Sequence, residues 1–91
     1  MEELKVLPQQ ELLKRLNANA SPCAAIFRRH GVRASVSTRG IVEVDSTYFP
    51  QGLIEWTKNS IAARDEIKST FGSFKSEDGK HFDGCDFLYI V

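Results

Sequence analysis

The segment VRASVSTRGIVEVD, residues 32–45, decides the fold of this chain. It predicts a β-hairpin whose loop is Thr38–Gly40, with Gly40 in the left-handed conformation that follows a type I turn. This loop sets a register that pairs apolar side chains on one face and polar side chains, including opposite charges, on the other. The pairs are Ala34 with Val44, Val36 with Val42, Ser35 with Glu43, and Arg33 with Asp45. A two-residue loop would set Val36 against Glu43, so the sequence favours the three-residue loop.

The residues before the hairpin predict two short helices. In Gln9–Asn17, which follows a proline suited to a first helical turn, the leucines share one face. The next residues, Asn17–Ala20, are predicted to form a loop. Ser21–Pro22 then supplies the N-cap and first residue of a second helix, which ends at Gly31. Ahead of both helices, Glu3–Leu7 is an apolar-rich segment that fits a short edge strand.

The residues after the hairpin predict one long helix and a last strand. The helix opens at Phe49–Gly52 and runs to about Thr70, with apolar side chains at helical spacing. The segment Phe87–Val91 is apolar at every position, which predicts a strand covered on both faces at the centre of the sheet. The side chains expected in the core include those of Trp56, Ile67 and Leu88.

The expected order of elements is helix, helix, strand, strand, helix, strand. We therefore predict an α+β fold in which the helices pack on a small, mostly antiparallel sheet. Residues 1–91 are few enough to form a single small domain.

Charge is unevenly distributed along a chain whose formal net charge is zero. No Asp or Glu occurs from Leu12 to Val42, whereas residues 43–91 carry more acids than bases. The bases of the acid-free stretch are Lys14, Arg15, Arg28, Arg29, Arg33 and Arg39. A block of one sign gives the folded protein an oriented field, which attracts phosphates or an acidic protein surface.

We predict a binding surface at residues 28–39, which we name the basic edge. Tyr48 and Phe49 are candidate anchors beside it, because aromatic side chains and arginines dominate the energetics of protein interfaces. The candidate binding residues are Arg28, Arg29, Arg33, Arg39, Tyr48 and Phe49. The expected function is non-enzymatic protein binding, as in a small inhibitor or adaptor, with an acidic protein surface as the partner.

Nucleic-acid binding by the same edge is the alternative. Two helices followed by a hairpin with an arginine at its tip are similar to the arrangement of a winged helix, whose wing contacts phosphates. Ser21–Val32 also resembles the first helix and turn of a helix-turn-helix, which would make Arg33–Arg39 a recognition helix. Ser35–Thr38 contains poor helix formers, which favours the hairpin. The zero net charge argues against nucleic acid, because most domains that bind it are basic.

No motif points to an enzyme, a metal or a cofactor. The sequence lacks a Gly-rich phosphate loop, a nucleophile elbow and a His-Glu-x-x-His motif. The spacing of Cys23, His30, His81 and Cys85 differs from that of structural zinc sites, and the two cysteines are expected to be unpaired thiols. No apolar run is long enough to span a membrane. Because two acidic residues follow Met1, the chain does not start like a signal peptide, and we expect a cytoplasmic protein.

Overall fold

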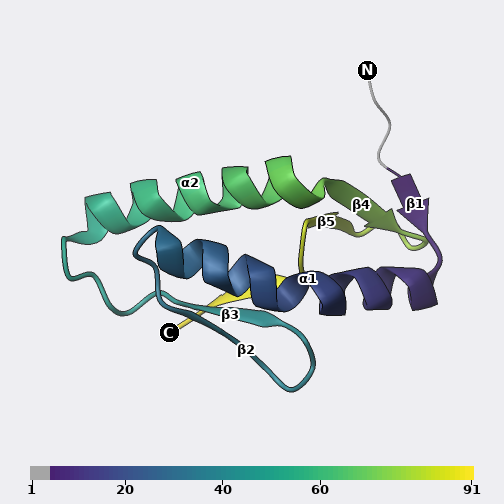
Figure 1. Ribbon diagram of the computed structural model, residues 1–91, viewed down its shortest axis with the longest axis horizontal. Helices are drawn as coiled ribbons and strands as arrows, with labels where there is room; N and C mark the ends of the chain where they lie inside the picture. The colour runs from purple at the N-terminus through teal and green to yellow at the C-terminus, as the bar shows by residue number, and fades with distance from the viewer. Residues whose placement is uncertain (1–4) are drawn as a thin grey trace.

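The computed structural model describes residues 5–91, which form two helices and two three-stranded sheets (Figure 1). In chain order the elements are β1 (Lys5–Leu7), α1 (Gln9–Arg29), β2 (Ala34–Val36), β3 (Val42–Asp45), α2 (Leu53–Phe71), β4 (Ser73–Ser76), β5 (His81–Asp83) and β6 (Phe87–Ile90). The predicted α+β class is confirmed, as is the order of a helical N-terminal part, a hairpin, a long helix and a last strand. β1 is the expected edge strand, and the first residues of that predicted segment, Glu3 and Leu4, lie outside the described residues.

The two helices lie side by side, and α1 has the more central position. In Figure 1, α1 lies between α2 and the β2–β3 hairpin, while the sheet that contains β1 and β4 lies at one end, near the first turns of α1. α1 contacts α2, β2, β3 and β4, so it touches strands of both sheets.

The strands form two small mixed sheets, instead of the single, mostly antiparallel sheet that was expected. Their orders are β1–β4–β5 and β2–β3–β6. The hairpin pairs β2–β3 and β4–β5 are antiparallel, whereas β1–β4 and β3–β6 are parallel. Parallel neighbours need a long crossover connection, and at least one helix lies in each of these two connections. Local sequence patterns predicted β1, β2, β3 and β6, but they predicted neither β4 and β5 nor which distant strands pair.

The first helix is continuous, so the predicted loop at Asn17–Ala20 was wrong. α1 passes through Pro22, which lacks an N–H and leaves the carbonyl of Ala18 without its helical partner. Ala18 and Pro22 are both exposed, so water can replace that hydrogen bond. The buried residues continue through the predicted loop at helical spacing: they are Leu12, Leu16, Ala20, Cys23, Ala24, Ile26 and Phe27.

The β2–β3 hairpin has the predicted register. The Cα partners are Ala34 with Val44, Ser35 with Glu43, and Val36 with Val42. Beyond them, the backbone N–H of Asp45 donates to the carbonyl of Arg33 over 2.8 Å. Gly40 has φ +78°, and a Cβ there would lie 2.1 Å from Asn17 Oδ1, so glycine also lets the hairpin tip pack on α1. Residues 33–39 are therefore strand and turn, and the interpretation as a recognition helix was wrong.

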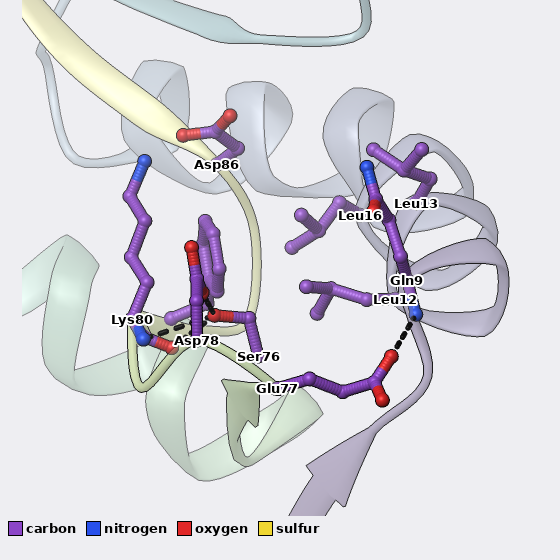
Figure 2. Close-up of a pocket in the computed structure, with 10 residues that line it drawn as sticks. Gln9, Leu12, Leu13, Leu16, Ser76, Glu77, Asp78, Lys80 and Asp86 are labelled. Carbon is purple, nitrogen blue, oxygen red and sulfur yellow. Dashed lines mark hydrogen bonds between the residues drawn. The ribbon is translucent and has the colours of Figure 1, made fainter.

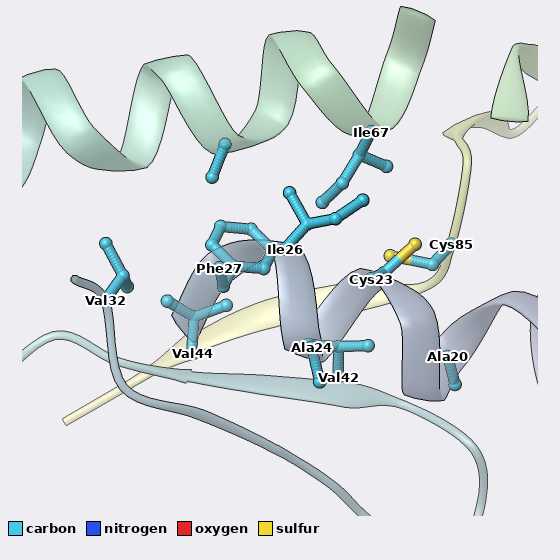
Figure 3. Close-up of a cluster of buried hydrophobic side chains, with 11 residues drawn as sticks. Ala20, Cys23, Ala24, Ile26, Phe27, Val32, Val42, Val44, Ile67 and Cys85 are labelled. Carbon is cyan, nitrogen blue, oxygen red and sulfur yellow. The ribbon is translucent and has the colours of Figure 1, made fainter. Parts of the chain in front are cut away.

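Two clusters of buried side chains form the core, and α1 contributes to both. The larger cluster joins α1, α2 and β3, and it includes Phe27, Val44 and Ile67 (Figure 3). The smaller cluster joins the first turns of α1 to the β1–β4–β5 sheet, and its members are Leu7, Leu12, Leu16 and Phe74. Ile67 is 1% exposed, which confirms its predicted burial.

β6 lies at the edge of its sheet, so the prediction of a central strand at Phe87–Val91 was wrong. β3 takes the central position between β2 and β6. Leu88, predicted to be buried, is 44% exposed, and Trp56 is half-buried. A run of apolar residues is typical of strands covered on both faces. Here Phe87 and Tyr89 pack on Phe27 of α1 and Trp56 of α2, whereas Leu88 and Ile90, which alternate with them, are exposed.

The contrast between Ile67 and Leu88 gives a test of this arrangement. Ile67→Ala removes buried methyl groups from the larger cluster and should lower the free energy of unfolding by about 2–5 kcal/mol. Leu88→Ala should lower it by about 1 kcal/mol or less, because much of that side chain is already in water. Chemical denaturation of both variants measures the difference, and equal losses would contradict the edge position of β6.

Candidate functional site

The arginines of the basic edge lie in the last turn of α1 and on either side of β2. Arg28 and Arg29 are in the last turn of α1, where positive charge complements the carbonyl end of the helix. Arg33 comes just before β2, while Arg39 lies in the turn that follows it. The structure therefore brings Arg28 and Arg33 to one corner of the molecule and separates Arg39 from them.

Arg28, Arg33 and Tyr48 form what we name the arginine–tyrosine corner. Arg28 and Arg33 line an open hollow of about 340 Å³ together with the turn at residues 31–34. Arg28 Nη1 donates a hydrogen bond of 2.9 Å to the carbonyl of Ala34, which ties α1 to β2. The guanidinium carbon of Arg33 lies 4.5 Å from the ring centroid of Tyr48, a cation–π contact. Tyr48 is 48% exposed, so the contact with Arg33 leaves much of this residue accessible to solvent.

Arg33 does not form the side-chain pair with Asp45 that its position in the hairpin suggests. Asp45 Oδ1 instead accepts hydrogen bonds from the backbone N–H of Thr47 at 2.7 Å and from its hydroxyl at 2.6 Å. These two bonds lower the pKa of Asp45, and Arg33 adds a smaller electrostatic contribution. Among residues 5–91, Arg33 has no ion pair.

Arg29 points toward α2 and forms an ion pair with Glu66. The same carboxylate contacts His30, whose Nε2 lies 2.8 Å from Glu66 Oε1. The hydrogen bonds from His30 and then from Arg29 lower the pKa of Glu66. Arg29 therefore fastens α1 to α2, and its charge is already neutralised.

Arg39 and Phe49, the other predicted binding residues, do not line the hollow at the corner. Arg39 sits at the hairpin tip, where its backbone N–H donates to Ser37 Oγ over 3.2 Å. Phe49 packs edge-on against Trp56, with 5.3 Å between ring centroids, and is half-buried. Trp56 in turn contacts Tyr89 at 5.7 Å, so Phe49 belongs to an aromatic group that closes one end of the core.

Several exposed apolar side chains on α2 and β6 were missed by sequence reasoning. On α2, Leu53 is 59% exposed, Ile54 74% and Ile61 53%. Ile54 and Ile61 flank the buried face of the helix, and this position was the available signal. On β6, Tyr89 and Ile90 are each 38% exposed.

A second hollow, of about 360 Å³, lies between the first turns of α1 and the β4–β5 hairpin (Figure 2). Its apolar wall comes from Leu12, Leu16 and Phe82. The polar groups around it hold one another: the backbone N–H of Gln9 donates to Glu77 Oε1 over 3.3 Å, and that of Lys80 donates to Ser76 Oγ over 2.9 Å. Their first role is thus to cap α1 and close the β4–β5 turn.

Ser73, His81 and Asp83 meet beside β5, but not in the order that nucleophilic catalysis needs. Ser73 Oγ lies 2.5 Å and His81 Nε2 2.7 Å from the same atom, Asp83 Oδ1. Burial opposes ionisation of Asp83, yet the hydrogen bonds from Ser73 and His81 lower its pKa. A catalytic serine must bond to the histidine, and here both bond to the carboxylate. This group therefore stabilises the hairpin.

No group of three metal-ligating side chains converges within residues 5–91. In that part of the chain, neither helix is both long and apolar enough to cross a membrane. The chain matches no protein-family model, no curated protein and no solved structure. The functional argument therefore depends on the geometry of the arginine–tyrosine corner and its surroundings.

The contacts of Glu66 predict a loss of stability in acid. Because folding lowers the pKa of Glu66, its contribution is fully present above the pKa of the unfolded chain, about 4.3, and is lost as the pH falls through the folded value. Glu66→Gln should therefore melt at a lower temperature than the parent at pH 7, and the difference should shrink below about pH 4.3.

A melting series from pH 7 to pH 3 measures this effect. Glu55→Gln is the control on the same helix, since Glu55 pairs only with Lys58 over 3.8 Å at the surface. Such exposed pairs contribute little to stability. A constant difference between Glu66→Gln and the parent across the series would contradict the assignment.

Proposed function

We propose that this protein is a non-enzymatic protein-binding module, such as a small inhibitor or adaptor, that presents the arginine–tyrosine corner to an acidic partner protein. The observation that supports this function is the stacking of Arg33 on Tyr48 beside Arg28, at an open hollow. We also propose a cytoplasmic location, which is supported by the two unpaired thiols.

The corner has the chemistry of a protein interface. Tyrosine and arginine are enriched among the residues that contribute most to binding energy. Stacking on Tyr48 restricts the Arg33 side chain, so less conformational freedom is lost when a partner carboxylate binds. The N–H groups at the edge of the guanidinium plane are the ones that make two parallel hydrogen bonds to a carboxylate.

The surrounding charges favour an acidic partner. Arg28 and Arg33 belong to the stretch from Leu12 to Val42 that contains no acid. Asp45 lies across the hairpin from Arg33, and its carboxylate accepts hydrogen bonds from Thr47 instead. Opposite charge on a partner would both steer the encounter and fix its orientation.

Nucleic-acid binding remains the alternative proposal, supported by the exposed hairpin that carries Arg39 at its tip. Two features count against it. α1 is a single helix, so residues 5–91 lack the pair of helices that precedes the wing in a winged helix. Arg29 is neutralised by Glu66, which leaves a smaller basic surface than the sequence suggests.

The test reverses the charge of the corner. Arg28→Glu combined with Arg33→Glu should weaken binding to the partner at least about tenfold, because two like charges would then face an acidic surface. The partner is identified by capture on the parent protein from nuclease-treated host extract, and affinity is measured by titration with the purified partner. Melting temperatures are recorded alongside.

The matched control is Lys14→Glu combined with Lys75→Glu, which changes the net charge equally at exposed positions elsewhere. The control should bind like the parent. If the corner variant binds as tightly as the control, the corner is not the binding surface. If the parent instead binds random duplex DNA with an affinity that falls steeply with salt, the nucleic-acid alternative replaces the proposal.

A further inference from the structure

The two cysteines lie side by side in the core, although they are far apart in the sequence. Cys23 is on α1, and Cys85 is in the short connection between β5 and β6. Both are free thiols, as expected, with exposed fractions of 0% and 2%. In Figure 3 the two sulfur atoms lie next to each other, with Ile67 of α2 nearby.

The connection that carries Cys85 is fixed against α1. Asn19 Nδ2 donates a hydrogen bond of 2.7 Å to the carbonyl of Gly84. Asn19 precedes Cys23 by one helical turn and so shares its face. Two successive residues of the connection, Gly84 and Cys85, therefore lie over two successive turns of the helix.

Gly84 also lets the connection pack closely against α2. It has φ +74°, and the N–H of Cys85 donates to the carbonyl of Asp83 over 2.8 Å, which makes a tight turn. A Cβ on Gly84 would lie 2.4 Å from Ile67 Cγ2, so the turn is pressed against α2 from the other side. The sulfur atoms are thus held in proximity by the fold.

We propose that Cys23 and Cys85 are a redox-sensitive pair, which a peroxide converts into an intramolecular disulfide that joins α1 to the start of β6. This inference is independent of the proposed binding function. Cys85 lines a hollow of about 380 Å³ between α2, β5 and β6, which gives a small oxidant a route to the pair.

The two thiols react in turn. The contact between them lowers the pKa of Cys23, whereas the same contact and burial raise the pKa of Cys85. One thiolate of the pair attacks hydrogen peroxide and takes one oxygen as a sulfenic acid, and the hydroxide released gains a proton to become water. The other thiol then attacks the sulfenic sulfur, and its proton leaves with the hydroxyl group as a second water. Two thiols and one peroxide thus become one disulfide and two waters.

The disulfide would change stability more than shape. It closes a loop that contains the hairpin, α2 and the β4–β5 pair, so it restricts the unfolded chain strongly. β6 begins two residues after Cys85, and the bond would hold this edge strand to α1. Oxidation should therefore raise the melting temperature of the protein by about 10 °C or more.

The experiment treats the full chain with hydrogen peroxide, blocks the remaining thiols under denaturing conditions and measures intact mass and melting temperature. We expect no blocked thiol, a mass lower by two hydrogen atoms, and a higher melting temperature that dithiothreitol reverses. Protease digestion should release the Cys23 and Cys85 peptides joined to each other.

Cys85→Ala and Cys23→Ala are the matched controls, since alanine fits a buried site of this size. Neither should show a peroxide-dependent rise in melting temperature, and neither should release linked peptides. If a variant does not fold, the linked peptides of the parent still decide the question. Two blockable thiols after peroxide treatment, sulfur oxidised beyond the sulfenic acid without a disulfide, or a disulfide between chains would each overturn the proposal.

Discussion

The packing of one unbroken helix against two separate sheets is the constraint on which the rest of the structure depends. The first turns of α1 bury Leu12 and Leu16 against the β1–β4–β5 sheet, and the later turns bury Cys23 and Phe27 against α2 and β3. A chain of this length buries too little surface for two independent cores. The helix contributes side chains to both small cores. Packing of α1 on one sheet therefore also helps to fix it against the other.

The sequence predicted the parts of the fold that are encoded locally. The β2–β3 register could be derived because its pairs lie a few residues apart and only one loop length satisfies both faces. The predicted loop at Asn17–Ala20 was wrong because the Ser21–Pro22 start signal lies inside a helix whose apolar periodicity continues through Ala20. Periodicity was the better guide, since burial of a whole helix face outweighs one missing hydrogen bond. The edge position of Phe87–Ile90 depends on strand order, which its composition does not contain.

The candidate site was predicted as a list of residues but not as an arrangement. The acid-free stretch located the arginines, yet their partners come from other segments of the chain. Glu66 on α2 forms an ion pair with Arg29, which neutralises its charge. Tyr48, in the loop after β3, makes a cation–π contact with Arg33, which orients that side chain. The contact between the two cysteines has the same origin. Contacts of this kind follow from how α1, α2 and the hairpin pack, which no local pattern in the sequence describes.

The different contacts of the arginines support the proposal that the corner, rather than the whole basic edge, binds a partner. Arg29 would have to leave Glu66 before it could meet a partner carboxylate, so the new ion pair would replace one of similar strength. Arg28 bonds to a backbone carbonyl and Arg33 stacks on a ring, so neither has to give up a carboxylate. Both side chains are nevertheless ordered before the partner arrives, which reduces the entropy lost on binding. Of the six basic residues in the acid-free stretch, the proposal therefore depends on Arg28 and Arg33, together with the ring of Tyr48.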